Sequence, residues 1–145
     1  MTIDTDSLSA ILPHPIPQQQ PAQLALFTIR RMAIGGLTDA HAANALLGRF
    51  GKSYRRPLVL LRALMAELAR GAKRPIVVAP CCCARMTQAE TMLLSAITAA
   101  NADAGYAHEQ LSILSGTGDC IGALTSAQAV SQAFADLGQP LNPLD

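Results

Sequence analysis

The 145-residue sequence has no tryptophan, and only 3% of its residues are aromatic. Charged residues are also scarce, at 14%, whereas 50% of the residues are hydrophobic. A core with so few rings has to be filled by small and medium aliphatic side chains. Alanine and leucine are abundant here, and both favour helices because they lose little side-chain entropy in them. We therefore predict a single all-α domain, a compact bundle of about five helices.

Long hydrophobic runs are absent as well. The longest, residues 57–69, is interrupted by Arg62 and Glu67, and it falls short of the roughly 20 apolar residues that cross a bilayer. Asp4 and Asp6 stand where a secretory signal would carry basic residues. Three of the four cysteines are consecutive, unlike the spaced cysteines of secreted disulfide-bonded domains. The sequence therefore indicates a cytoplasmic protein that does not enter a membrane.

Lysine and arginine are missing from both ends of the chain, because all eleven lie between residues 30 and 85. Positive charge is densest in one predicted loop, at Arg49, Lys52, Arg55 and Arg56. Phe50 and Tyr54 are interleaved with these residues, a composition typical of a phosphate-binding patch whose rings stack on bases. A solvated basic face, balanced by the acidic ends of the chain, explains the same charges without nucleic acid.

The chain divides into three parts by composition. Residues 1–20 are rich in proline and glutamine, so we expect an extended or mobile arm there. Residues 21–138 form the helical domain, and residues 139–145 form a C-terminal tail. This division leaves about 120 residues for the bundle, enough for one hydrophobic core.

Five segments have the spacing of apolar residues that predicts a helix. They run from Pro21 to the stop at Gly35–Gly36, from Thr38 or Asp39 to near Gly48 or Gly51, from Pro57 to Arg70, from Pro80 or Thr87 to Ala100, and from Asp119 to Leu137. Asp119 is the expected cap of the last helix. The pattern is ambiguous at 76–79 and 110–114, so the alternative fold is α+β with two very short strands at those positions.

The most unusual feature is the triplet Cys81–Cys82–Cys83 near the start of the predicted fourth helix. A thiolate at a helix N-terminus is stabilised by the helix dipole, and Arg85 would add positive charge. Cys81 and Cys83 are therefore candidate reactive thiols, with Cys120 as a candidate resolving partner. The alternative is structural, because Cys82 falls on the apolar stripe of the helix and a free cysteine packs as a small hydrophobe.

A metal site is the third interpretation of the cysteines. Structural zinc takes four ligands, and the candidates are Cys81, Cys83, His108 and Cys120. Zinc-binding sequences usually pair their ligands two to four residues apart in both halves of the site, whereas His108 and Cys120 are far apart. We therefore predict no cofactor, with zinc or iron as the alternative.

The segment from Pro80 to Glu90, with its cysteines and the capping-box sequence Thr87–Gln88–Ala89–Glu90, precedes the apolar helix Met92–Ala100. This segment resembles small uncharacterised bacterial proteins, domains of unknown function, that have a cysteine-containing turn before a capped helix. The resemblance implies a small helical protein and no particular activity.

Taken together, these features favour a non-enzymatic interaction or regulatory protein. Its basic segment, residues 49–74, would contact an acidic protein or a nucleic acid. A thiol-based or metal-binding protein that uses residues 81–83 is the alternative function. Because so apolar a helical chain has little polar surface, we also expect one apolar helix face to be shared in a homodimer.

Overall fold

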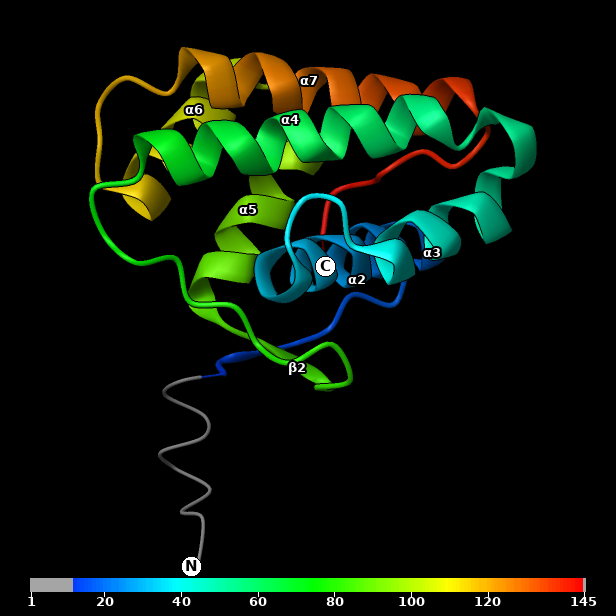
Figure 1. Ribbon diagram of the computed structural model, residues 1–145. Helices are drawn as coiled ribbons and strands as arrows, with labels where there is room; N and C mark the ends of the chain where they lie inside the picture. Colours follow the sequence, from blue (N-terminus) through cyan, green and yellow to red (C-terminus); the bar gives the residue numbers. More distant parts are fainter. Residues whose placement is uncertain (1–11, 145) are drawn as a thin grey trace, which may run out of the picture.

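Residues 12–144 are described by the structure, which is a computed structural model. Within this range the chain forms six α-helices (Figure 1). They are α2 (Gln20–Gly35), α3 (Ala40–Phe50), α4 (Arg55–Gly71), α5 (Gln88–Ala99), α6 (Ala104–Ser115) and α7 (Ile121–Asp136), and the 3-10 turn η1 (Gly51–Ser53) joins α3 to α4. The predicted all-α bundle is confirmed, with six helices where five were expected.

The helices pack as two pairs with α5 between them. Helices α4 and α7 lie side by side in opposite directions, α2 and α3 form the opposite side, and α5 crosses the middle with α6 against it (Figure 1). The core is made of leucine, isoleucine and many alanines, several of which have no exposed surface. Small side chains allow this close approach of helices, as the scarcity of aromatic residues predicted.

The alternative α+β fold is wrong in its placement of the strands. Residues 76–79 form no regular element, and residues 110–114 lie inside α6. Ala107, Leu111 and Leu114 of α6 are all buried, and their spacing of four and three residues places them on one helix face. That face packs against α5.

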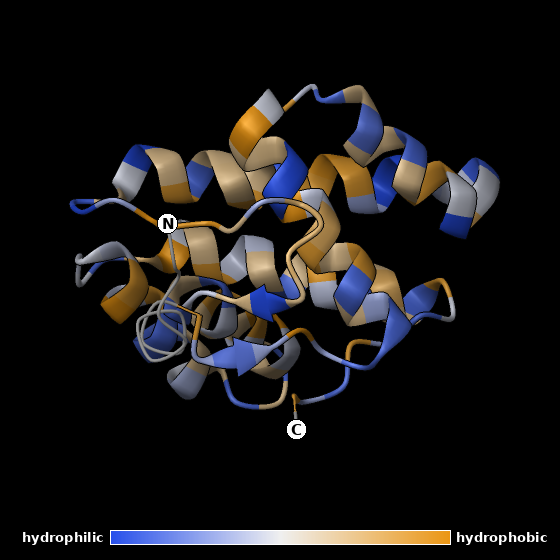
Figure 2. Ribbon diagram, turned by 90° about the horizontal axis from the view of Figure 1, so that it is seen from below, coloured by the Kyte–Doolittle hydropathy of each residue, from blue (hydrophilic) through white to orange (hydrophobic). Residues whose placement is uncertain are grey.

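Two strands of two residues each do occur, β1 (His14–Pro15) and β2 (Arg85–Met86). They pair antiparallel, with His14 opposite Met86. In Figure 2 they are seen side by side on the side of the bundle away from α4 and α7. Arg85 extends the contact, because its guanidinium donates hydrogen bonds to the carbonyls of Leu12 and Pro13 at 2.7 and 2.9 Å.

The described residues before α2 meet the C-terminal tail at the start of that helix. The described part of the proline-rich arm, residues 12–19, is extended, and residues 1–11 of the expected arm lie outside the described range. The side chain of Gln19 donates to the carbonyls of Asn142 and Pro143 and accepts from the Asn142 amide, each at 3.1 Å. Leu141 of the C-terminal tail is buried in the core.

The predicted helix starts are confirmed where the side chain just before the helix caps its first backbone amides. Asp39 accepts from the amide of Ala42 at 2.9 Å and caps α3. Thr87 and Glu90 form the expected capping box of α5. Asp119 was wrongly expected to cap α7, because the capping position belongs to Cys120, whose side chain makes no capping hydrogen bond.

Among the described residues, no helix combines the length and the apolar character needed to cross a membrane.

Candidate functional site

The three consecutive cysteines lie on a turn, outside any helix. The amide of Cys83 donates to the carbonyl of Pro80 at 3.0 Å and closes this turn, which we call the cysteine turn (residues 80–83). Helix α5 begins only at Gln88. The start at Thr87 is therefore confirmed and the start at Pro80 is wrong, so the helix dipole does not act directly on these thiols.

The predicted packing of Cys82 in the core is also wrong. Cys82 is exposed, whereas Cys81 and Cys83 are half-buried. The sulfur atoms of Cys81 and Cys82 lie 3.5 Å apart. The hydrogen bond to Cys81, followed by the charge of that thiol, raises the pKa of Cys82, and nearby Arg31 opposes the rise to a smaller extent. The two adjacent thiols thus behave as a pair.

A buried arginine holds the cysteine turn against α2. The guanidinium of Arg30 donates to both carboxylate oxygens of Glu90, at 2.6 and 3.0 Å. It also donates to the carbonyls of Cys83 and Arg85, each at 2.8 Å. The side chains of Arg30 and Glu90 are only 2% and 1% exposed. One side chain therefore fixes the backbone on both sides of residue 84.

Glu90 completes this anchor from the α5 side. Besides its contacts with Arg30, its carboxylate accepts from the amide of Thr87 at 2.9 Å and from that of Ala79 at 3.3 Å. Thr87 donates in turn to the carbonyl of Val77 at 2.7 Å. No side-chain nitrogen or oxygen buried within residues 12–144 lacks a hydrogen-bond partner. The loop before α5 is therefore held by a fully satisfied polar network around one ion pair.

Arg31, the next residue on α2, lies nearer the solvent and pairs with Asp39 at 2.9 Å. The hydrogen bond from Arg31, together with that from a backbone amide, lowers the pKa of Asp39 to about 2. The same hydrogen bond is the main cause of the raised pKa of Arg31, and Cys81 contributes to a smaller extent. Arg31 thus places positive charge beside the cysteine turn.

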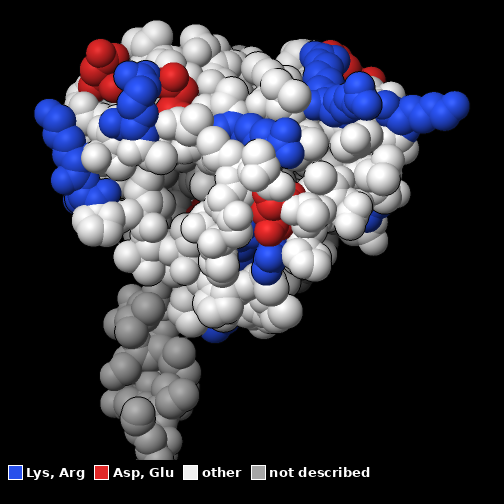
Figure 3. Space-filling view, viewed as in Figure 1, with Lys and Arg blue, Asp and Glu red and all other residues white. Residues whose placement is uncertain are grey.

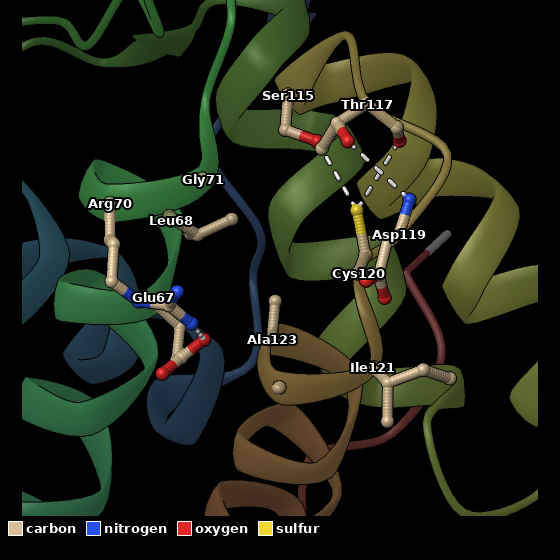
Figure 4. A pocket seen from close by; sticks show the side chains of 11 residues that line it. Glu67, Leu68, Arg70, Gly71, Ser115, Thr117, Asp119, Cys120, Ile121 and Ala123 are labelled. Atoms are coloured by element: carbon tan, nitrogen blue, oxygen red, sulfur yellow. Dashed lines mark hydrogen bonds and ion pairs between the residues drawn. The ribbon is translucent and has the colours of Figure 1, made fainter.

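Cys120 lies elsewhere, at the start of α7. It is buried, with its sulfur 3.3 Å from the hydroxyl of Ser115 and 3.5 Å from the carbonyl of Thr117. It borders a cavity of about 290 Å³ between α4 and the loop joining α6 to α7. Glu67 and Arg70 of α4 lie across this cavity from Cys120 (Figure 4).

The structure does not bring the proposed metal ligands together. Cys81 and Cys83 lie on the turn before β2, whereas Cys120 lies beside the loop between α6 and α7 at a different part of the bundle (Figure 1). His108 is half-buried on α6. In residues 12–144, no group of three or more histidine, cysteine, aspartate or glutamate side chains could hold a metal ion. Cys120 is likewise placed away from the thiols it was expected to resolve.

The four basic residues singled out in the sequence are all exposed at one corner, where α3, η1 and α4 meet. We call Arg49, Lys52, Arg55 and Arg56 the basic corner. Figure 3 shows basic residues gathered over this corner, near the middle of α4 and again at the far end of α4. Only Arg56 of the corner forms an ion pair with a described residue, with Asp136 at 2.8 Å.

The aromatic residues next to the basic corner face the core. Phe50 packs its ring at 79° to that of Phe134, with the ring centroids 5.1 Å apart. Tyr54 is also half-buried against the core. These rings are therefore not displayed for stacking on bases, and the predicted combination of basic and aromatic surface is wrong in its aromatic part.

Sequence comparison places the chain in a family. A model described as "Family of unknown function (DUF6628)" matches residues 1–138. The chain belongs to this family, and the resemblance to domains of unknown function is confirmed. No curated protein and no solved structure matches the chain. The family carries no activity with it, so a function has to be argued from the surface and the thiols.

Proposed function

We propose that the protein is an interaction module that binds an acidic segment of another protein at its basic corner and along the exposed face of α4. The observation that carries this proposal is a group of three exposed cations, Arg49, Lys52 and Arg55, that form no ion pair within the described residues. An acidic partner would supply the missing counter-charges, and these would speed its association.

The face of α4 that continues from the basic corner is mixed in character. Arg55, Val59 and Arg62 follow one another at helical spacing and share one face. Val59 is 57% exposed, and Arg62 donates to the carbonyl of Leu37 at 2.7 Å. A basic stripe that contains an exposed apolar residue suits a partner helix with both acidic and apolar side chains.

A protein partner is favoured over a nucleic acid for two reasons. The rings of Phe50 and Tyr54 are half-buried and pack against the core, so they are not free to stack on bases at this corner. Acidic side chains also stand among the basic ones, because Asp136 pairs with Arg56 and Glu67 pairs with Arg70. Carboxylates repel both ligands, but a peptide can place its acidic side chains away from them, whereas a nucleic acid carries a negative charge at every nucleotide.

The proposal is tested with a fluorescent amphipathic peptide of alternating glutamate and leucine faces, titrated with the full chain at low and high salt. The variant Arg49→Gln/Lys52→Gln/Arg55→Gln removes the three free charges. Each exposed charge contributes about 0.2–1 kcal/mol, so we expect binding to weaken by about 10-fold at low salt. Affinity of the native chain should fall as salt rises.

A control variant changes the net charge equally but elsewhere. Gln18, Gln20 and Gln88 are exposed, so Gln18→Glu/Gln20→Glu/Gln88→Glu adds three negative charges and lowers the net charge by the same three units. At physiological salt its affinity should stay within about 2-fold of native, because the added charges lie outside the basic corner and salt screens charges that do not contact the peptide. Equal loss in both triple variants would refute a local site. Tighter binding of a duplex or single-stranded oligonucleotide than of the peptide would refute the protein partner.

The proposed compartment is the cytoplasm. All four cysteines are free thiols in the structure, and three of them are not deeply buried, a state that a reducing compartment maintains.

A further inference from the structure

Outside the basic corner, the best-defined chemical group is the pair of adjacent thiols on the cysteine turn. The sulfur atoms of Cys81 and Cys82 are 3.5 Å apart, well beyond the S–S bond length of about 2.05 Å. Arg30 holds the backbone of the turn that carries them through the carbonyl of Cys83. The two sulfurs lie at a separation that one bridging atom can span.

The separation of the sulfurs limits what that atom can be. With bonds of about 2.3 Å, the length of a zinc–thiolate bond, one atom joins sulfurs 3.5 Å apart at an angle of about 100°. Zinc would need two further protein ligands, and residues 12–144 hold no group of three metal-binding side chains. A pyramidal trivalent centre, such as arsenic, has angles of this size and needs only one more bond.

A hollow beside the thiols could accommodate the group on that third bond. Its volume is about 310 Å³, and its walls include all three cysteines of the turn. The rest of its wall is largely apolar, with Ile16, Leu26 and Phe27, and also includes Gln23 and Arg30. The third substituent would therefore be an organic group, which gains free energy by leaving water for an apolar surface.

We propose that Cys81 and Cys82 form a two-thiol site that chelates a trivalent organoarsenical, whose organic group lies in the hollow between the cysteine turn and α2. In the reaction with an arsonous acid, R–As(OH)₂, two As–O bonds break and two As–S bonds form. The two thiol protons leave with the two hydroxides as two water molecules. Arsenic stays trivalent and no oxidant or reductant is needed.

The electrostatics of the pair agree with this reaction. The pKa of Cys82 is raised by its hydrogen bond to Cys81 and by the charge of that thiol, which favours the protonated form of Cys82. The leaving hydroxide accepts that proton, and chelation does not require both thiols to be ionised beforehand. The nearby Arg31 lowers the pKa of Cys82 to a smaller extent.

The test uses reduced full-length protein and phenylarsine oxide, which is phenylarsonous acid in water. We expect one phenylarsenic group per chain by native mass spectrometry, stable to glutathione and released by a dithiol. Cys81→Ser and Cys82→Ser should each weaken binding by about 100-fold, because the second As–S bond then loses its intramolecular advantage. Cys83→Ser, on the same turn, is the matched control and should bind within about 3-fold of native.

Labelling of the unmodified protein keeps the test independent of how the variants fold. Phenylarsine oxide should protect Cys81 and Cys82, but not Cys83, from iodoacetamide in the tryptic peptide that contains all three. Inorganic arsenite, which has no organic group, should bind more weakly than the phenyl compound. Release by glutathione, equal loss in Cys83→Ser, protection of Cys83, or tighter binding of arsenite would each overturn the proposal.

Discussion

The ion pair between Arg30 and Glu90 makes a sharp prediction about stability. Arg30→Met keeps much of the volume and the apolar stem of the side chain but removes the charge and four hydrogen bonds. Glu90 is left as a buried carboxylate without its counter-ion, since only 1% of its side chain is exposed. Breaking a buried pair in this way costs about 3–5 kcal/mol. That is a large share of the about 5–15 kcal/mol by which a domain of this kind is stable.

The double variant Arg30→Met/Glu90→Leu separates the charge effect from the hydrogen bonds to the backbone. Removing both charges avoids the unpaired ion, so the double variant should lose less stability than the sum of the single variants. It should nevertheless be less stable than native, because the carbonyls of Cys83 and Arg85 keep no donor from Arg30. Each polar group left without a partner costs about 1–3 kcal/mol when buried.

Urea denaturation followed by far-UV circular dichroism measures these free energies, with Arg31→Met as the control on the same helix. Arg31 is nearer the solvent, so its replacement should cost much less than that of Arg30. Hydrogen exchange should speed up most at residues 79–86, the segment that Arg30 holds. A cost below about 1 kcal/mol for Arg30→Met, or additive effects in the double variant, would refute the anchor.

Named contacts support three other predictions. The hydrogen bond from Arg31 lowers the pKa of Asp39 from 3.8 to about 2. The ionised carboxylate therefore stabilises the fold fully at pH values above about 4. This contribution is lost as the pH falls from about 4 to about 2, so thermal unfolding of Asp39→Asn should depend less on pH in that window. Thr87→Ala removes the capping box of α5 and the bond to Val77 and should cost about 1–2 kcal/mol in urea denaturation, whereas Thr87→Ser should cost little. We propose that the homodimer forms through the exposed apolar strip of Val77 and Ile113. Light scattering should then show a dimer for the native chain and a monomer for Ile113→Asp.

The helices were predictable because their patterns are local. Asp39 and Thr87 cap the helices they precede, and each cap is encoded within four residues. The sequence leaves helix α6 undecided because Leu111, Ile113 and Leu114 fit no single period. Ala107, which is fully buried, supplies the missing position one turn before Leu111. A pattern that counts alanine as a core residue indicates the helix.

The position of Cys82 could not be predicted from the helical spacing of apolar residues in the sequence. Met86 is buried, and in the sequence it continues the helical spacing of the apolar residues of α5. The same spacing extends back to Cys82. The backbone is already extended at Met86, however, because Arg85 and Met86 pair with β1. Cys82 precedes this strand, so it shares no helix face with α5 on the other side of it. Only the pairing with His14 and Pro15, about 70 residues away in sequence, reveals this.

The role of Arg30 could not be read from the basic segment to which it belongs. It follows Leu26 by one helical turn, so it shares the buried face of α2, and this was the available signal. Its partner Glu90 is 60 residues away and already had a local explanation as a capping residue. Glu90 contacts both Thr87 and Arg30, and only its contact with the nearby Thr87 can be inferred from the sequence.

Several of the basic residues are buried or already paired, so their total number overestimates the charge available to a binding partner. Arg30 is buried, and three more arginines are paired with carboxylates. Those three are Arg31, Arg56 and Arg70. The salt dependence of binding reports the charges that a partner newly neutralises. At the basic corner these are three, so the dependence should be far weaker than eleven lysines and arginines in one segment suggest. A steep dependence would instead mean that a partner breaks the existing ion pairs or reaches the cations at the far end of α4.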